Sequence, residues 1–311
     1  MESETVFHEP WWLDIVCSGM DVGFAEVSKR GATEARWPWA ITTNRGLRRI
    51  VQPPLTQYLG PTWEPSLAKP AKATSRYHAL MAEILDQLPA VDDLRVRCSP
   101  DVRNWLPMYW KGMQQTTRYT YIVNGLEDLE RVRSGFAENI SRDLKKAERS
   151  LRAREGTADE LLMTTSAVFS RFGRGLPFQE RMMRQLVEAA KGRDAGAVVA
   201  VEDRGGQVHA VLFTVWGMGR AHYVMGGAHP QLKNSGANTL AIWSAMKRTS
   251  LVAKSFDLEG SMIPAVERYL RGFGGDLTPY FDLTARTLKA RAARTLSSGR
   301  RVVRDILKRS G

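Results

Sequence analysis

The sequence predicts an α/β protein, α+β in the arrangement of its elements, with two similar modules in tandem and a basic C-terminal helix. The length of 311 residues is about twice that of a common domain, and 43% hydrophobic with 25% charged residues is an ordinary globular composition. Hydrophobic periodicity predicts the same order of elements in each half: an antiparallel three-stranded meander, then a helix, then a further strand. We therefore expect two modules, each a mostly antiparallel mixed sheet flanked by helices, and not one large sheet.

The first module is expected to span residues 1–135. Helical spacing of apolar residues predicts helices at 9–17 and 73–88. Alternating and β-branched runs predict its strands, which we place at 24–29, 34–43, 46–52, 94–98 and 116–123. Five prolines within residues 53–70 exclude a regular helix or a central strand, so this segment is expected to be an ordered loop or a lid.

The second module is expected at residues 157–285, after a linker of residues 136–156 that holds a charged helix at 139–153. Periodicity predicts the helices of this module at 158–172, 178–191, 237–251 and 263–271. Its strands are predicted at 197–202, 208–216, 221–225, 254–258 and 276–284. A meander at the start disfavours a dinucleotide-binding fold, in which strands and helices alternate from the beginning.

The net charge of +12 is concentrated at the C-terminus. Residues 286–311 hold nine Lys or Arg against the single Asp305, so bulk charge gives little support for a nucleic-acid-binding body. Val302, Val303, Ile306 and Leu307 form an apolar stripe in this tail. The pattern predicts a basic helix that contacts an anionic membrane or tRNA, and a solvated helix packed on its own domain fits it equally well.

A polar turn that contains glycine leads from a strand into a helix and is the first candidate binding site. Such a turn presents backbone N–H groups and the positive end of the helix to an anion. Its candidate residues are Lys233, Asn234, Ser235, Gly236, Ala237 and Asn238. The alternative is a surface helix capped by Ser235 or Asn234.

This turn resembles the pyrophosphate loop of the Gcn5-related N-acetyltransferase (GNAT) superfamily, whose Q/R-x-x-G-x-G/A motif it matches in part. Lys233 stands at the first position and Asn238 at the last. The resemblance implies that the turn binds acetyl-coenzyme A, or another acyl-coenzyme A, as donor.

A second stretch, residues 256–283, is similar to the C-terminal signature of the FemABX aminoacyltransferases and of related acetyltransferase-like proteins of bacterial envelope and capsule biosynthesis. The matching features are Asp257, the run Glu259-Gly260-Ser261, the pair Phe273-Gly274 and the strand at 280–283. The resemblance implies tandem GNAT modules, with a degenerate first module that shapes the acceptor site. FemABX members carry a lysine after an aromatic residue in the short helix, but here Leu270 follows Tyr269, which favours acyl-coenzyme A over aminoacyl-tRNA as donor.

Acyl transfer to an amine needs a base, a polarised carbonyl and a proton for the departing thiolate. Glu259, at the end of a predicted strand, is our candidate base, directly or through water, although it also suits a cap on the following helix. Asp257 lies two residues earlier on the same strand face, so one carboxylate of the pair is expected to accept the proton while the other orients the amine. Tyr223 is the candidate donor to the thiolate, with simple strand packing as the alternative.

The first half is rich in aromatic residues, since seven of the nine tryptophans precede residue 111. Aromatic planes beside polar groups suit sugars, and an arginine suits a phosphate or carboxylate, although a Trp-rich core explains most of the tryptophans. The candidate substrate-binding residues are Gln57, Tyr58, Arg118, Tyr119 and Ser261.

Several other classes of site lack sequence support. The five histidines show no metal-ligand spacing, so we expect no metal site, and the serine-hydrolase, CxxC and P-loop motifs are absent. Cys17 and Cys98 are expected to be buried thiols. No apolar run approaches the ~20 residues of a membrane helix and no secretory signal is visible, so we expect a cytoplasmic protein, with peripheral contact at the inner face of the membrane as an option.

The sequence therefore predicts an N-acyltransferase that moves an acyl group from acyl-coenzyme A to an amine, with an amino sugar of an envelope or capsule precursor as the candidate acceptor. Aminoacyl transfer from charged tRNA to a cell-wall precursor is the first alternative. A GNAT-fold binding module without catalysis is the second. The oligomeric state is left open.

Overall fold

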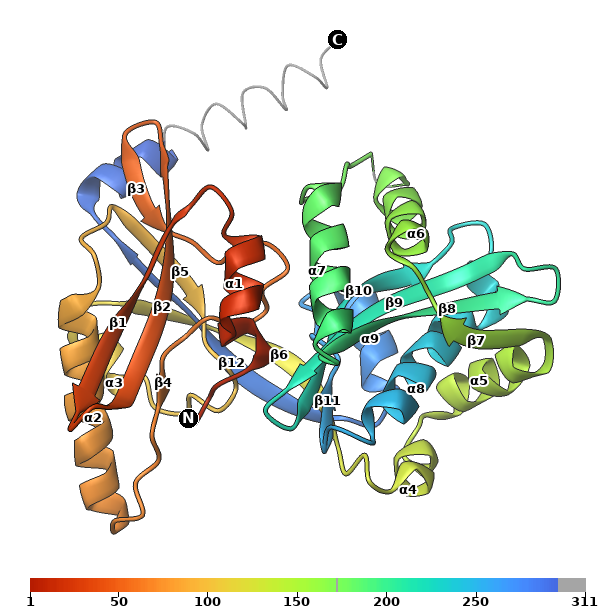
Figure 1. The fold of residues 1–311 in the computed structure, drawn as a ribbon, viewed down its shortest axis with the longest axis horizontal. Coiled ribbons are helices and arrows are strands. Elements are labelled where there is room, and N and C mark those ends of the chain that lie inside the picture. The colour runs from red at the N-terminus through yellow and green to blue at the C-terminus, as the bar shows by residue number, and fades with distance from the viewer. Residues whose placement is uncertain (172, 296–311) are drawn as a thin grey trace.

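The computed structural model describes residues 1–171 and 173–295, and its strands form one sheet of twelve strands (Figure 1). The strand order is β1-β2-β3-β5-β12-β6-β11-β10-β9-β8-β7, with β4 paired to β2. The strands are β1 (Asp21–Lys29), β2 (Ala32–Asn44), β3 (Leu47–Ile50), β4 (Thr62–Trp63), β5 (Asp93–Arg97), β6 (Gln114–Asn124), β7 (Leu151–Glu155), β8 (Gly196–Asp203), β9 (Val208–Gly217), β10 (Arg220–Ala228), β11 (Ser255–Asp257) and β12 (Asp276–Arg286). Most pairs are antiparallel, and only β3·β5 and β10·β11 are parallel among the described residues.

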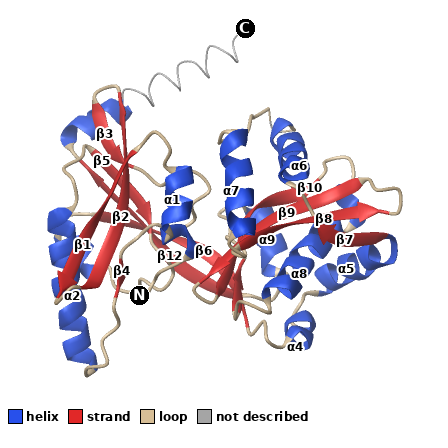
Figure 2. Cartoon of the chain, viewed as in Figure 1, coloured by secondary structure: helices blue, strands red, loops and turns tan. Residues whose placement is uncertain are grey.

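Helices lie on both faces of this sheet, as Figure 2 shows, which confirms the predicted α/β class. The helices are α1 (Pro10–Val16), α2 (Pro70–Gln87), α3 (Leu106–Trp110), α4 (Leu129–Ser134), α5 (Glu138–Ser150), α6 (Ala158–Ser170), α7 (Glu180–Gly192), α8 (Ala237–Thr249) and α9 (Pro264–Arg271), with 3-10 turns at Val6–His8 and Lys233–Ser235. None of the helices in the described ranges is both long enough and apolar enough to cross a membrane.

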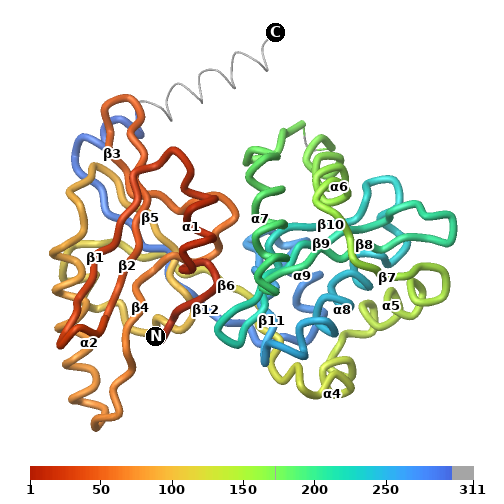
Figure 3. The backbone as a smooth tube through the Cα atoms, viewed as in Figure 1, coloured from red at the N-terminus to blue at the C-terminus, as the bar shows by residue number. Residues whose placement is uncertain are grey.

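The two halves share one continuous sheet, which corrects the expectation of two separate sheets. The last strand, β12, returns to the first half and pairs along its length with β6 and β5. Figure 3 shows the blue β12 entering the half that begins with the red β1. β6 in turn pairs with β11 of the second half. Long β6 and β12 strands give both halves a partner for edges that would otherwise expose unpaired backbone groups. The residue boundaries of the modules stay a prediction.

Two hydrophobic cores lie on opposite faces of the sheet. One joins the first half to α6 and α7, and the other lies between α4, α5, α8 and α9. β8 divides between them, because Val198 and Ala200 face the first core while Val199 and Val201 face the second. A strand covered on both faces reads as a continuous apolar run, which explains the sequence of this strand.

The charged linker helix ends earlier than predicted and is followed by a strand. α5 stops at Ser150, and β7 then forms the outer edge of the sheet. Arg152 and Arg154 of β7 both pair with the buried Glu202 of β8. Charged side chains protect an edge strand from further pairing, and the same charges made this segment read as helix.

The tail is described only at its start. Residues 288–295 are helical, Ala290 is buried, and Nζ of Lys289 donates to the Gly46 carbonyl at 2.8 Å. The tail therefore begins by packing on the first half. The rest of the predicted basic helix, residues 296–311, lies outside the described residues.

Candidate functional site

The central parallel pair of strands opens into a cavity. β10 and β11 pair only from Arg220 opposite Ser255 to His222 opposite Asp257, after which β10 continues to Ala228. The cavity that opens beyond this point has a volume of about 720 Å³, within the usual range for a small-molecule site. β10, the turn before α8, the loop after β11, α8, α9 and one residue of α5 form its walls.

A bulge in β10 places Tyr223 at this opening. The register of β10 against β9 shifts between Tyr223 and Met225. A Cβ at the nearby Gly226 would lie 2.5 Å from the Val211 carbonyl oxygen and 3.0 Å from the Tyr223 hydroxyl, so a larger residue does not fit there. Burial raises the pKa of Tyr223 well above its ordinary value, and electrostatic interaction with Tyr269 and Glu259 adds to the shift. The phenol is therefore protonated at neutral pH.

The turn between β10 and α8 forms the far end of the cavity. Gly236 is the N-cap of α8 with φ of 79°, and a Cβ there would lie 2.3 Å from the Asp143 carbonyl oxygen of α5. Nζ of Lys146, also on α5, donates to the Asn234 carbonyl at 2.7 Å. Packing on α5 therefore fixes a left-handed residue that only glycine adopts easily.

Three of the six predicted loop residues line the cavity: Lys233, Gly236 and Asn238. Ser235 donates its hydroxyl to the Leu232 carbonyl at 2.8 Å instead, and Ala237 is buried in the core. Nδ2 of Asn238 donates to the Tyr269 hydroxyl, while its buried Oδ1 has no hydrogen-bond partner among the described residues. Gly236, not Ser235 or Asn234, is the N-cap of α8, although the Ser235 hydroxyl accepts the Ala237 N–H of the first turn at 3.4 Å.

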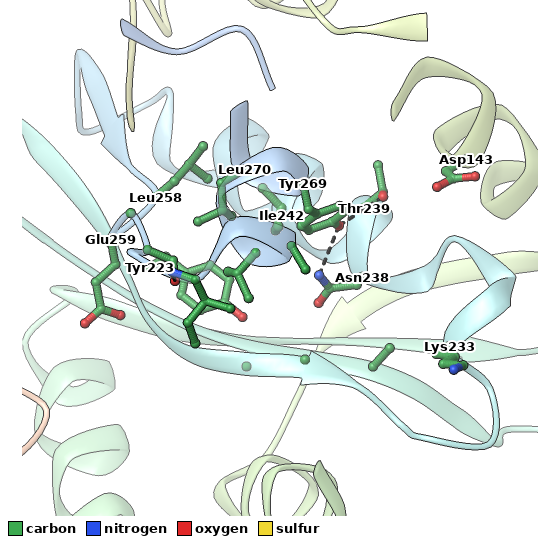
Figure 4. Close-up of a pocket in the computed structure, with 18 of the residues that line it drawn as sticks. Asp143, Tyr223, Lys233, Asn238, Thr239, Ile242, Leu258, Glu259, Tyr269 and Leu270 are labelled. Atoms are coloured by element: carbon green, nitrogen blue, oxygen red, sulfur yellow. Dashed lines mark hydrogen bonds between the residues drawn. The ribbon is translucent and has the colours of Figure 1, made fainter. Parts of the chain in front are cut away.

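Glu259 lies at the opposite end of the cavity, beside Tyr223. Figure 4 shows this pair at one end, Lys233 at the other and Asn238 between them. Glu259 also lines a second cavity of about 290 Å³, together with Leu55 and Phe178. Its carboxylate is therefore available to ligands on both sides of the gap between the strands.

Burial, together with the charge of Asp257, raises the pKa of Glu259 to about 8, while Arg97 opposes the shift. A carboxyl group with such a pKa exchanges a proton near neutral pH, as a general base must. The alternative role as a helix cap is not seen, since α9 begins after Ile263 without a side-chain cap.

Asp257 is fully buried and lines neither cavity. Its Oδ1 accepts the backbone N–H of Glu259 at 2.8 Å and the hydroxyl of Thr120, and its Oδ2 accepts the Tyr58 hydroxyl at 2.7 Å. Gln57 donates to the same carboxylate at 3.3 Å. His222 lies beside this network, and burial lowers its pKa to about 4. Gln57 and Tyr58, predicted as substrate contacts, are thus buried around Asp257.

The remaining predicted residues are dispersed. Ser261 lines the large cavity, and its hydroxyl accepts the Ile263 N–H. Tyr119 is 41% exposed on β6. Arg118 lines a separate cavity of about 670 Å³, where Nη1 lies 3.4 Å from Oδ2 of Asp282. Trp12, Trp37 and Trp63 are buried, as a tryptophan-rich core predicts, whereas Trp110 is 61% exposed.

Among the polar lining residues, sequence reasoning did not identify Asp143, Thr239 and Tyr269 as part of the site. Asp143 was one charge among many in a helix predicted as a linker. Thr239 and Tyr269 bond to each other across α8 and α9, and a pairing of that kind leaves no mark in a single sequence. No group of three or more metal-ligating side chains occurs within residues 1–171 and 173–295. Cys17 and Cys98 are buried free thiols, as predicted.

Comparisons with known proteins find a family model that matches part of the chain and solved structures with a similar fold. Residues 134–260 match the family model of the acetyltransferase (GNAT) domain. A comparison with curated proteins found no match. The crystal structure of FemX superposes with a TM-score of 0.65 at 10% identity, covering 89% of this chain and 91% of that one.

Two further solved structures share the fold. L-PGS from Bacillus licheniformis has a TM-score of 0.52 at 10% identity, covering 94% of this chain and 91% of that one. The C-terminal DUF2156 domain of an Agrobacterium fabrum protein described as a lysylphosphatidylglycerol synthetase has a TM-score of 0.53 at 11% identity, covering 91% and 88%. The predicted resemblance to the FemABX group is thus confirmed at the level of the fold, and residues 134–260 are similar to the acetyltransferase (GNAT) domain.

Proposed function

We propose that this protein is an N-acyltransferase that uses acyl-coenzyme A, with acetyl-coenzyme A as the simplest donor, to acylate an amine. One observation carries the proposal. A single cavity of about 720 Å³ is lined at one end by Lys233, Gly236 and Asn238 and at the other by Tyr223 and Glu259. An elongated donor can therefore place its anionic end on the loop and its thioester beside the two titratable groups.

The anionic end of the donor binds at the start of α8. Backbone N–H groups and the helix dipole there attract a pyrophosphate, and Lys233 adds a positive charge. Asn238 holds Tyr269 with its amide and keeps its Oδ1 unpartnered within the described structure, so this oxygen suits a donor N–H group of the ligand.

The chemical step takes place at the other end of the cavity, beside Tyr223 and Glu259. The amine nitrogen attacks the thioester carbon, the bond from that carbon to sulfur breaks, and the nitrogen loses a proton to the Glu259 carboxylate. The Tyr223 hydroxyl donates a proton to the thiolate. The pKa of Glu259, about 8, lets it accept a proton near neutral pH, and the raised pKa of Tyr223 keeps that hydroxyl protonated until the thiolate forms.

The proposal for the acceptor names only a class of compound, an amine, and is less specific than the proposal for the donor. Glu259 faces a second cavity that Leu55 and Phe178 also line, on the side away from the loop. An amino sugar is one candidate amine. The burial of Gln57 and Tyr58 removes two of the polar contacts that we expected for it.

Contact of the basic tail with anionic membrane or tRNA, and a cytoplasmic location, belong to the same proposal. The tail contact rests on the charge of residues 286–311.

Titration calorimetry with acetyl-coenzyme A and with desulfo-coenzyme A tests the donor. We expect micromolar binding of both, weakened in Lys233→Gln and unchanged in Lys72→Gln, which removes an exposed charge from α2. Release of free thiol in the presence of an amine panel then tests transfer. Absence of coenzyme A binding contradicts the proposal and favours aminoacyl-tRNA as donor. Binding without transfer to any amine favours a module without catalysis.

A further inference from the structure

The polar face of the sheet in the first half carries a concentration of arginines. Antiparallel partners point to the same face, and the pairs Arg95 with Thr284, Arg97 with Asp282, and Arg118 with Tyr280 place these side chains together. Arg286 extends the group at the far end of β12. We call Arg95, Arg97, Arg118 and Arg286 the arginine face. Three of its members, Arg95, Arg118 and Arg286, line the cavity of about 670 Å³.

The arginine face is positive after its ion pairs are counted. Asp282 accepts two hydrogen bonds from Arg95, at 3.0 and 2.6 Å, and lies 3.4 Å from Arg118. Nε of Arg286 lies 3.1 Å from Oδ1 of Asp93. Four guanidinium groups thus share two carboxylates, and guanidinium groups do not lose their charge near neutral pH.

Two donors on the arginine face are buried without a hydrogen-bond partner. Nε of Arg97 and Nε of Arg118 each lacks a hydrogen bond within the described part of the chain, whereas Nε of Arg286 keeps its ion pair with Asp93. Leaving a buried charged donor unsatisfied is costly, so such groups mark a place where a ligand supplies the acceptor. The rim of the cavity adds Trp105 and the 58% exposed Tyr109, whose rings lie 5.5 Å apart.

A short path of contacts joins the arginine face to Glu259. Arg118 and Thr120 lie on the same face of β6, about 7 Å apart along the strand. The Thr120 hydroxyl donates to Asp257, which in turn holds the N–H of Glu259. Gly260 packs against the backbone of β6 at Tyr119 and Thr120, where a Cβ would lie 2.1 Å from the Tyr119 carbonyl oxygen. Arg97 lies close enough to lower the pKa of Glu259.

We propose that the arginine face binds an oxyanion of the acceptor, a phosphate or a carboxylate, while the acceptor amine lies at Glu259. This assignment rests on the proposed function for the identity of the amine site, but the anion site itself stands on the arginines alone. Strand spacing puts the oxyanion on the order of 10 Å from the amine. The substrate class is therefore an amine that also carries a phosphate or carboxylate group. Amines without such an anionic group are poor acceptors.

Direct binding tests the anion site without acyl transfer. Calorimetry measures the binding of inorganic pyrophosphate and of citrate to the full chain. The test variants are Arg95→Gln and Arg118→Gln, each made singly so that the buried Asp282 keeps one partner. Arg204→Gln, in the exposed turn between β8 and β9, removes the same charge elsewhere. We expect affinity to fall about tenfold or more in both test variants and to stay unchanged in Arg204→Gln. Tighter binding of pyrophosphate identifies a phosphate site, and tighter binding of citrate a carboxylate site.

A variant of opposite sign separates anion binding from damage to the fold. Asp282→Asn keeps the shape of the side chain and removes the carboxylate that competes for Arg95 and Arg118, so pyrophosphate or citrate binding should strengthen. Equal affinity in all variants, or loss of binding only in Lys233→Gln, overturns the proposal. If coenzyme A fails to bind while the anion effects appear, the proposed donor is wrong and the anion site stands.

Discussion

The backbone N–H of Glu259 donates to Oδ1 of Asp257 at 2.8 Å, and this bond holds Glu259 at a φ of 62°. A glutamate is strained in the left-handed region, so the surrounding contacts must stabilise it there. Asp257 is itself held by Tyr58 and Thr120, which come from the first half of the chain. The candidate base is therefore positioned by residues of both halves, and because Asp257 lines neither cavity we expect it to act through Glu259.

Replacing Glu259 by glutamine should abolish most of the acyl transfer and leave donor binding intact. The amide cannot accept the amine proton, and general-base groups contribute typically about 10²–10⁴-fold. Thiol release with a reactive amine gives kcat, and calorimetry with desulfo-coenzyme A gives the donor Kd. A variant with wild-type kcat shows that the base lies elsewhere.

The rate and the stability should both depend on the raised pKa of Glu259. As the carboxylate forms, kcat/KM should rise through pH 8 and then level off. Because the folded state holds this proton up to about pH 8 and the unfolded chain releases it near 4.5, the stability contribution of the group declines as pH rises between these values. The Tm of Glu259→Gln relative to wild type should thus increase from pH 6 to pH 9. A pH-independent difference contradicts the burial of an ionisable group here.

Replacing Asp257 by asparagine should shift the pH profile to lower pH. Its negative charge raises the pKa of Glu259, and asparagine removes the charge while keeping an oxygen to accept the Glu259 N–H. The inflection of kcat/KM should move down from about 8. Tyr58→Phe removes one hydrogen bond to Asp257 but keeps the charge, so its inflection should not move down. Identical profiles for the two variants indicate a purely structural role for Asp257.

Local patterns predicted most elements, because periodicity reports which face of a strand or helix is buried. The meander of β8, β9 and β10 and the helices α7 and α8 lie close to their predicted ranges. What periodicity does not report is which strands pair over long distances. The return of β12 to the first half, and hence the continuous sheet, depends on contacts between residues more than 150 positions apart.

The same limit applies to the site. Glu259, Tyr223 and the loop at 233–238 were predicted because motif and strand ends mark them in the sequence. Gln57 and Tyr58 were predicted as substrate contacts because a Pro-rich loop suggests the surface. They are buried because their polar atoms bond to Asp257, 200 and 199 positions away. Of the arginine face, only Arg118 was predicted as a site residue. The other members lie on β5 and β12, which are distant from Arg118 in the sequence.

Replacing Gly236 by alanine should weaken donor binding about tenfold or more. The residue combines a φ of 79° with a Cβ position 2.3 Å from the Asp143 carbonyl oxygen, so the loop must move away from α5. Gly206 is a matched control, because its φ of 83° imposes the same strain while no atom lies within 4 Å of its Cβ position. Both variants should lose stability, on the order of 1 kcal/mol from the strain alone. Only Gly236→Ala should lose coenzyme A affinity, and equal donor Kd values for the two would show that the loop does not hold the donor.

Truncation should separate the tail from the folded chain. A chain that ends at Thr295 keeps β12, the buried Ala290 and the contact of Lys289 with Gly46, so it should fold and retain acyl transfer. It loses five of the basic residues of the tail, so its binding to vesicles of anionic lipid or to tRNA should be weaker at low salt. A chain that ends at Thr284 also loses the end of β12 and the pairing of Arg286 with Asp93, and its Tm should fall. Sedimentation with vesicles, filter binding of tRNA and thermal melting measure the three outcomes. Unchanged association of the longer truncation with both partners would place any anionic contact on the folded chain, where the arginine face is the leading candidate.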